Sequence, residues 1–191
     1  MNLLAPDLLV KIFDELPACD LMILPGSKNV IGDLTHLKQQ GWPEKINRHL
    51  RYGGKLLGVC GGFQMLGQTI NDPQGIESNQ LSIDGLGFAD FSTELTENKQ
   101  LKQIQGQSCF SETIADFKGY EIHCGESSGK ALNTPAFEIS SGDQKQKRYE
   151  GFISADNQIM GTYIHGLFDS SEMNKAIFDW INPKHKINQG F

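Results

Sequence analysis

The sequence lacks the features of several large protein classes. No apolar run approaches the roughly 18 residues that a membrane-spanning helix needs. Residues 1–16 carry charged side chains among the apolar ones, so they do not have the form of a secretory signal. We therefore expect a cytoplasmic protein that does not act at a membrane.

Clustered positive charge is also scarce. The net charge is -6 at pH 7, and the one short basic run is Lys145-Gln146-Lys147-Arg148. Nucleic acids and anionic membranes both select for clustered Lys and Arg, so neither is expected as the main partner. We interpret the basic run as the solvated tip of a hairpin.

Cysteine pairs with the spacing of a metal or redox motif are absent. Cys19, Cys60, Cys109 and Cys124 are widely scattered, with no C-x-x-C pair. In a chain of this size without a signal, we expect free thiols in a reducing cytoplasm. No metal site is predicted at His123 and Cys124, because adjacent strand residues point to opposite faces.

A phosphate-binding G-x-x-x-x-G-K-[ST] loop is absent as well, so the chain is not expected to bind ATP by itself. The composition, 38% hydrophobic and 21% charged, is ordinary for a globular protein, and 191 residues suit one domain with a real core. We expect residues 1–191 to form a single domain, because repeats and low-complexity linkers are also missing.

The most informative stretch present is Gly58-Val59-Cys60-Gly61-Gly62. Glycine inside a strand or helix costs roughly 0.5 to 1 kcal/mol relative to alanine, so these glycines indicate a backbone requirement. The pattern matches a nucleophile elbow, G-x-S-x-G, with Cys60 in the serine position. It predicts a strained Cys60 whose thiolate is favoured by NH groups of the following helix. An inert core cysteine is the alternative when Cys60 is taken alone.

The order of elements predicts an α/β fold with a doubly wound, mostly parallel sheet and flanking helices. Residues 20–24 and 55–59 are continuously apolar, as in strands covered on both faces. Helices are expected from Gly32, from Pro43 and, after the elbow, through about Ile70. Short segments rich in β formers predict added antiparallel strands at 85–88, 102–105, 119–123, 137–140 and 150–154.

The last part of the chain predicts a buried strand followed by a helix. The strand begins at Ile159 and delivers His165 to its end. We expect Asp169 and Glu172 to cap the helix. One apolar stripe on that helix is interpreted as core: Met173, Ala176, Ile177, Trp180 and Ile181.

A catalytic cysteine needs an imidazole that takes its proton and later returns it. His165 is the strongest candidate, because its strand ends at the face toward which the elbow points. A structural histidine is the alternative when it is taken alone. His123 lies near another strand end, whereas His36, His49 and His185 are interpreted as surface residues.

A tetrahedral intermediate also needs NH donors for its oxyanion. The NH of Gly61, directly after the nucleophile, is one candidate. The NH of Gly26 or Ser27, at the end of the neighbouring strand, is the other. Gln64 lies one turn into the elbow helix, where its side chain could face the substrate.

Several collinear motifs resemble those of the class I, cysteine-dependent glutamine amidotransferases, in particular the amidotransferase domain of cobyric acid synthase. The similarity runs from about Asp20 to Trp180. The motifs are Pro25-Gly26-Ser27-Lys28-Asn29, the stretch 58–67, Asp72-Pro73-Gln74-Gly75-Ile76-Glu77-Ser78, Gly119-Tyr120-Glu121-Ile122-His123 and Gly161-Thr162-Tyr163-Ile164-His165-Gly166.

The resemblance implies that Cys60 attacks the side-chain amide of L-glutamine to give a glutamyl thioester, with His165 as base and then acid. Gln64 and the Gly26 region would hold glutamine. The segment of Tyr120, Glu121 and His123 would shape the pocket or the contact with a partner.

The resemblance also implies a partner. Ammonia would pass to a separate synthetase domain or subunit, which would use ATP and Mg to amidate four carboxylates of the corrinoid cobyrinic acid a,c-diamide. No cofactor is expected in this chain, and its activity is expected to be weak without the synthetase half.

Two departures qualify the resemblance. Many class I amidotransferases have Glu two residues after the histidine, where this chain has Leu167. The corrinoid branch commonly lacks that Glu, which leaves Glu121 and Asp169 as candidates to orient His165. The family's first strand and helix have little room in residues 1–19, so we expect this part of the domain to be truncated.

Two alternatives stay open at this point. One is the glutaminase subunit that pairs with a cell-wall precursor ligase, although the Pro-Gly-Ser-Lys-Asn and His-Gly-Leu-Phe sequences favour the corrinoid branch. The other is a non-catalytic regulatory or docking relative, against which the joint presence of Cys60, His165, Gly26 and Gln64 argues.

Overall fold

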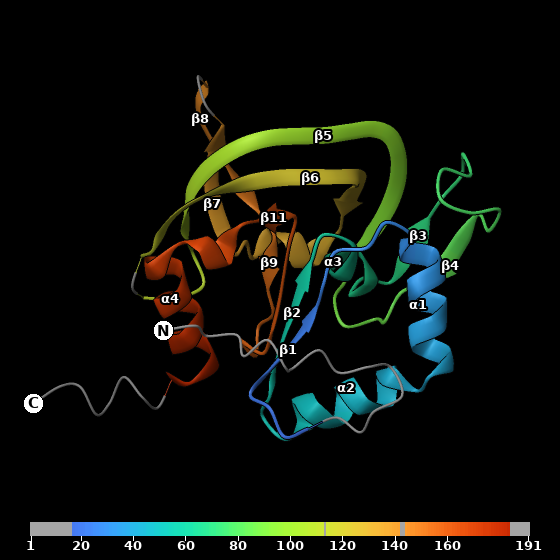
Figure 1. Ribbon diagram of the computed structural model, residues 1–191, viewed down its shortest axis with the longest axis horizontal. Helices are drawn as coiled ribbons and strands as arrows, with labels where there is room; N and C mark the ends of the chain where they lie inside the picture. Colours follow the sequence, from blue (N-terminus) through green and yellow to red (C-terminus); the bar gives the residue numbers. More distant parts are fainter. Residues whose placement is uncertain (1–16, 113, 142–143, 184–191) are drawn as a thin grey trace, which may run out of the picture.

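The computed structural model describes residues 17–112, 114–141 and 144–183, and it contains two sheets (Figure 1). The expectations for residues 1–16 and for His185 lie outside these ranges. No helix in the described ranges has the length and apolar character needed to cross a membrane.

The first sheet has four strands in the order β1-β2-β10-β9. Its strands are β1 (Leu21–Leu24), β2 (Lys55–Val59), β10 (Ile159–Thr162) and β9 (Phe152–Ile153). β1 and β10 run parallel to β2 on either side, and β9 is antiparallel to β10. The predicted parallel strands at 20–24 and 55–59 are therefore confirmed, and β2 delivers Cys60 from the centre of the parallel part.

Two helices connect β1 to β2, as the sequence predicts: α1 (Val30–Gln39) and α2 (Trp42–Arg51). α1 begins two residues earlier than expected, because the Asn29 side chain accepts a hydrogen bond from the Gly32 NH and caps the helix there. Leu34 of α1 and Ile46 of α2 are fully buried, in keeping with one apolar face on each helix.

The helix after the elbow is much shorter than predicted. The helix was expected to run through about Ile70, but α3 spans only Gly61–Met65. Thr69 and Ile70 lie instead in strand β3 (Thr69–Asn71). At Gly67 a Cβ would lie 2.6 Å from the carbonyl oxygen of Phe91, and the next NH, that of Gln68, donates to the same oxygen. This close approach turns the chain out of the helix and into the second sheet.

The second sheet runs in the order β11-β6-β5-β3-β4, with β7 beside β5 and β8 beside β7. Its further strands are β4 (Ser82–Asp84), β5 (Ser92–Ser108), β6 (Asp116–Ser128), β7 (Phe137–Ser141), β8 (Gln144–Glu150) and β11 (Ile164–His165). In Figure 1, β5 and β6 run side by side above the ends of β1 and β2. The antiparallel addition is therefore a sheet of its own over the parallel one.

Three of the five predicted antiparallel segments lie in β5, β6 and β7, but two predictions need correction. Residues 85–88 are not a strand, since Gly85 lies too close to the Gly67 carbonyl for a side chain and Gly87 has a φ of 72°. Residues 150–154 are divided between β8 and β9 by Gly151, which has a φ of 68°. A positive φ ends a strand, and glycine adopts it at little cost.

The basic run at 145–148 is also placed differently from the prediction. It lies within strand β8 instead of at a hairpin tip. Arg148 forms an ion pair with the buried carboxylate of Glu121, whereas Lys147 pairs with Glu138 at the surface.

The final helix, α4 (Ser171–Ile181), buries the predicted apolar stripe except for the half-buried Ile181. Its cap differs from the expected pair of Asp169 and Glu172. The Ser170 hydroxyl accepts a hydrogen bond from the Met173 NH, and Asp169 ends the short 3-10 helix η2 (Leu167–Asp169) before it. A second short 3-10 helix, η1 (Lys130–Asn133), follows β6.

The chain changes sheets between β10 and β11. β10 lies in the parallel sheet, and after Tyr163 the chain enters the antiparallel sheet as β11. The buried Glu150 carboxylate holds this crossing, since it accepts hydrogen bonds from the Thr162 hydroxyl and the Tyr163 NH at 2.6 and 2.7 Å. His165 is thereby placed beside β6 instead of at the end of β10.

Candidate active site

Cys60 has the backbone conformation that the elbow predicts. Its φ of 52° and ψ of -111° lie in a region that non-glycine residues rarely adopt. The Cys60 NH donates to the Thr162 carbonyl oxygen at 2.8 Å, which ties the turn to β10. At Gly62 a Cβ would collide with the carbonyl of Leu24 in β1, so the turn leaves no space for a side chain there.

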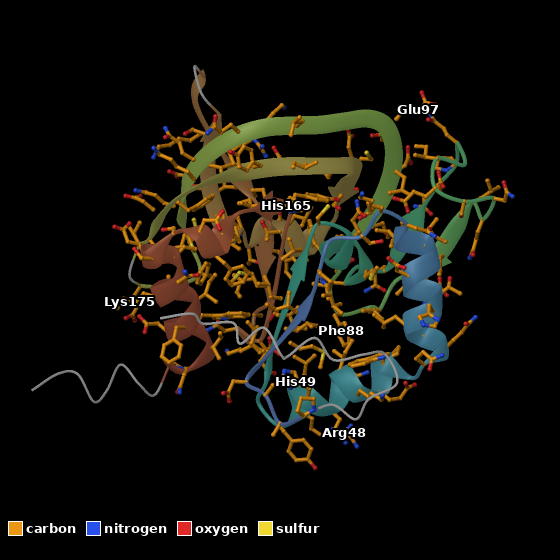
Figure 2. All side chains as sticks on the ribbon, viewed as in Figure 1. Arg48, His49, Phe88, Glu97, His165 and Lys175 are labelled. Atoms are coloured by element: carbon orange, nitrogen blue, oxygen red, sulfur yellow. The ribbon has the colours of Figure 1, made fainter. Side chains whose placement is uncertain are left out.

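Cys60 and His165 come together beside Gly26. A Cβ on Gly26 would lie 3.6 Å from the Cε1 atom of His165 and 3.7 Å from the Cβ atom of Cys60. Figure 2 shows His165 beneath β6, close to the middle of the molecule. The Nε2 atom of His165 is buried and has no hydrogen-bond partner among the described residues.

The two candidate oxyanion donors lie next to each other. A Cβ on Gly61 would be 2.8 Å from the backbone nitrogen of Ser27. The Ser27 hydroxyl points to α1, where it donates to Asp33 at 2.5 Å. The NH of Ser27 and the backbone of Gly61 therefore border the same side of the Cys60 turn.

The thiol of Cys60 is more protonated than the sequence predicts. Burial raises the pKa of Cys60 above its ordinary value, while the Gly61 NH hydrogen bond opposes that change, and Cys124 and Glu77 raise the pKa further. The Sγ atom donates to the Ile122 carbonyl oxygen at 3.2 Å. The expected lowering of the Cys60 pKa is wrong for this state, because burial outweighs the hydrogen bond from the Gly61 NH.

Gln64 faces the interior of the site. It is buried, its NH donates to the Cys60 carbonyl at 3.0 Å, and its side-chain amide donates to the Tyr163 hydroxyl at 3.3 Å. A Cβ on Gly125 would lie 2.6 Å from the amide nitrogen. The side chain is therefore enclosed by α3, β6 and the β10–β11 crossing.

The remaining predicted residues lie around this centre. Tyr120 is opposite His165 in the β6–β11 register and about half exposed. Glu121 binds His123 and Arg148 instead of the unpartnered Nε2 of His165. Asp169 lies in η2, three residues beyond the Gly166 turn. That Glu121 or Asp169 orients His165 stays a prediction.

Two residues near the site were not singled out from the sequence. Tyr163 contacts both Gln64 and His123. The sequence pattern around Tyr163 indicates only a buried strand. Glu77 accepts a hydrogen bond from the Val30 NH at 2.7 Å and lies near enough to Cys60 to affect its pKa. The sequence signal that could have identified Glu77 is the turn at Asp72. The buried Asp72 carboxylate accepts hydrogen bonds from the NH groups of residues 76, 77 and 78.

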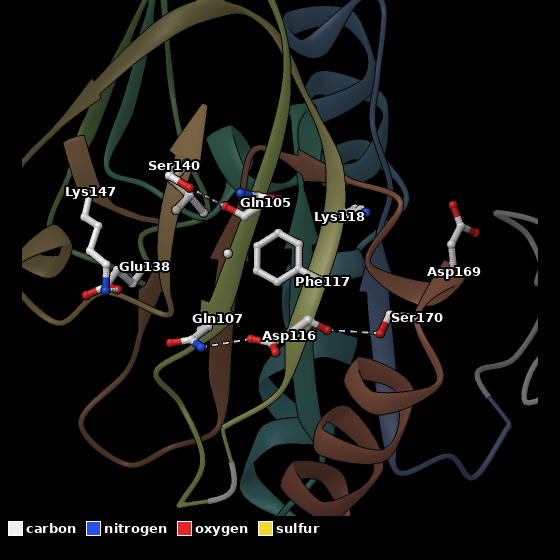
Figure 3. A pocket seen from close by; sticks show the side chains of 12 residues that line it. Gln105, Gln107, Asp116, Phe117, Lys118, Glu138, Ser140, Lys147, Asp169 and Ser170 are labelled. Atoms are coloured by element: carbon white, nitrogen blue, oxygen red, sulfur yellow. Dashed lines mark hydrogen bonds and ion pairs between the residues drawn. The ribbon is translucent and has the colours of Figure 1, made fainter. Parts of the chain in front are cut away.

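The second sheet also carries a hollow, shown in Figure 3. It has a volume of about 660 Å³ and is lined by β5, β6 and β7 together with Lys147, Asp169 and Ser170. Neither Cys60 nor His165 lines it. We therefore do not assign the hollow to glutamine.

The comparison with protein families identifies the chain. Residues 7–173 match the CobB/CobQ-like glutamine amidotransferase domain. The chain belongs to this family. The resemblance based on its motifs is thereby confirmed.

Solved structures extend the comparison to the fold. The structure of PurLQS from Thermotoga maritima aligns with 88% of this chain and 81% of its own, at 15% identity and a TM-score of 0.56. A glutamine amidotransferase structure aligns with 85% of this chain and 79% of its own, at 11% identity and a TM-score of 0.48. The similarity to the PurLQS structure confirms the predicted α/β fold.

Proposed function

We propose that this amidotransferase domain hydrolyses the side-chain amide of glutamine through a thioester on Cys60. The observation that carries the proposal is the meeting of Cys60 and His165 beside Gly26. The strained backbone of Cys60 and the unpartnered Nε2 of His165 support it. A non-catalytic relative has no need of a strained cysteine beside an imidazole whose Nε2 atom has no partner among the described residues.

The reaction follows from the chemistry of these two groups. His165 takes the thiol proton as Sγ attacks the amide carbon, and the oxyanion faces the NH groups of Gly61 and Ser27. His165 then gives its proton to the amine as the carbon–nitrogen bond breaks, which releases ammonia. Water attacks the thioester with His165 as base, and the carbon–sulfur bond breaks to give glutamate and the thiol.

We further propose that an ATP-dependent synthetase domain or subunit uses this ammonia to amidate cobyrinic acid a,c-diamide to cobyric acid. The order of the motifs and the absence of a phosphate-binding loop from the sequence support a division of labour between two halves. ATP and Mg would bind to that other half. Activity of this chain alone would then be low.

The first experiment identifies the nucleophile. The protein is incubated with a glutamine-mimicking diazo-ketone, and the adduct is mapped by mass spectrometry. We expect labelling of Cys60, loss of labelling in Cys60→Ser and no change in the matched control Cys109→Ser. A label on Cys109 or Cys124 with Cys60 untouched would contradict the catalytic assignment.

The second experiment identifies the ammonia acceptor. A complex with the synthetase half is given glutamine, ATP, Mg and cobyrinic acid a,c-diamide, and products are followed by mass spectrometry. We expect four successive amidations. Amidation of a peptidoglycan precursor in place of the corrinoid would support the cell-wall alternative, and glutamine turnover unchanged by the synthetase half would contradict the coupling.

A further inference from the structure

Both ring nitrogens of His123 face hydrogen-bond acceptors. Nδ1 lies 2.7 Å from the Gly125 carbonyl oxygen, and Nε2 lies 3.2 Å from a carboxylate oxygen of Glu121. A carbonyl and a carboxylate are both acceptors, so the ring has a polar contact at each of its two nitrogens. The His123 ring is therefore fixed in its orientation on β6.

Glu121 joins His123 to Arg148. Its carboxylate is buried, with a side-chain exposure of 6%, and it binds His123 through one oxygen and Arg148 through the other. Burial by itself would raise the pKa of Glu121, but the hydrogen bonds from His123 and Arg148 outweigh burial and lower it. The charged form of Glu121 thus holds His123 in place from β6 and β8.

The His123 ring stacks on Tyr163. The ring centroids are 3.9 Å apart and the planes are inclined by 21°. Tyr163 is buried, and its hydroxyl accepts the hydrogen bond from the Gln64 amide and contacts the Ser127 hydroxyl at 2.7 Å. Because the two rings are stacked, the position of the Tyr163 ring depends on His123.

A second route leads from His123 to Gln64. The carbonyl of Gly125 is bound by His123, and the Cα of Gly125 approaches the Gln64 amide too closely to carry a side chain without displacement. Tyr163 and Gly125 therefore contact the same carboxamide, and His123 holds both.

We propose that His123, held in place by the ion pair of Glu121 with Arg148, positions the Gln64 carboxamide for glutamine through Tyr163 and Gly125. His123 is a positioning residue, since it acts through these neighbours. The inference rests on the proposed function, because it requires that Gln64 contacts glutamine bound at Cys60.

The test compares two reagents that react with Cys60. A glutamine-mimicking diazo-ketone needs the glutamine pocket, and its concentration for half-maximal labelling rate reports pocket affinity. Iodoacetamide needs only a reactive, accessible thiol. In His123→Ala we expect the half-maximal concentration of the diazo-ketone to rise about tenfold, while the iodoacetamide rate at Cys60 changes less than about twofold.

Tyr163→Phe keeps the stacked ring and removes only the hydroxyl that holds Gln64. We expect its half-maximal concentration to rise about threefold to tenfold, which corresponds to one hydrogen bond. This variant keeps the inference testable if His123→Ala does not fold, as judged by circular dichroism.

The neighbouring residues of β8 provide a matched control. Arg148→Met should shift the half-maximal concentration in the same direction as His123→Ala, because Glu121 loses one of the two partners that hold its carboxylate. Lys147→Met removes an ion pair of the same kind at the surface, and we expect no shift.

The outcomes separate this inference from the proposed function. If the wild type is not labelled at Cys60 by the diazo-ketone, the proposed function fails. If the wild type is labelled and folded His123→Ala and Tyr163→Phe keep its half-maximal concentration, the inference alone is overturned. A parallel fall in the iodoacetamide rate would also overturn it, since His123 would then act on the thiol instead of the pocket.

Discussion

The Sγ atom of Cys60 donates a hydrogen bond to the carbonyl oxygen of Ile122, which belongs to a different sheet. β6 therefore lies directly over the nucleophile that β2 delivers. A carbonyl oxygen stabilises the thiol and repels the thiolate, so the described state is one in which the nucleophile keeps its proton.

This relationship predicts slow reaction of Cys60 with simple thiol reagents at neutral pH. Burial raises the pKa of the Cys60 thiol, and the thiolate is the reacting form. The labelling rate with iodoacetamide should rise with pH, with a midpoint above the value of about 8.5 for an unperturbed cysteine. Mass spectrometry of the Cys60 adduct between pH 6 and pH 10 measures the labelling rate, and a midpoint near neutrality would contradict the prediction.

His165→Asn should remove general acid–base catalysis while leaving the site intact. Proton transfer by a positioned side chain contributes about 100-fold to 10,000-fold, so glutamine hydrolysis should fall by that factor. Ammonia release measures the loss. His36→Asn, on the partly exposed surface of α1, serves as the control and should keep wild-type activity.

The buried Glu150 should make stability depend on pH. Its pKa is raised to about 7, chiefly because burial disfavours the charged form. The folded state therefore binds the proton more tightly than the unfolded state. This stabilisation is complete below the unfolded pKa of Glu150 and is lost as pH rises through 7, which lowers the free energy of unfolding by roughly 3 kcal/mol.

The measurement for Glu150 is the free energy of unfolding in urea at pH 5 and pH 8. We expect a larger decrease between these values for the wild type than for Glu150→Gln, because the amide does not ionise. An equal decrease for both proteins would show that other groups account for the dependence.

Gly62→Ala should destabilise the elbow. Its Cβ would collide with the Leu24 carbonyl, and overpacking in a tight interior typically costs about 1 to 3 kcal/mol. Gly53→Ala is the control, since its Cβ would meet no atom of the described residues within 4 Å and only its φ of 88° is strained. Thermal unfolding should show a larger decrease in melting temperature for Gly62→Ala than for Gly53→Ala.

Local patterns predicted much of the scaffold. The continuous apolar runs identify β1 and β2, and the apolar stripe of α4 identifies its buried face. The predicted length of α3 was wrong. The helix ends at the contact between Gly67 and Phe91, and these two residues lie far apart in the chain. Tertiary contacts of this kind override local helix propensity.

The candidate site shows the same division. The sequence by itself determined the strained turn at Cys60, since only a backbone requirement explains its glycines. Tertiary structure alone decided what surrounds it: Arg148 binds Glu121 across 27 positions, Cys60 binds Ile122 across 62, and Gln64 binds Tyr163 across 99. Such contacts leave no periodic signal, because they depend on which strands pair and not on the order of neighbouring residues.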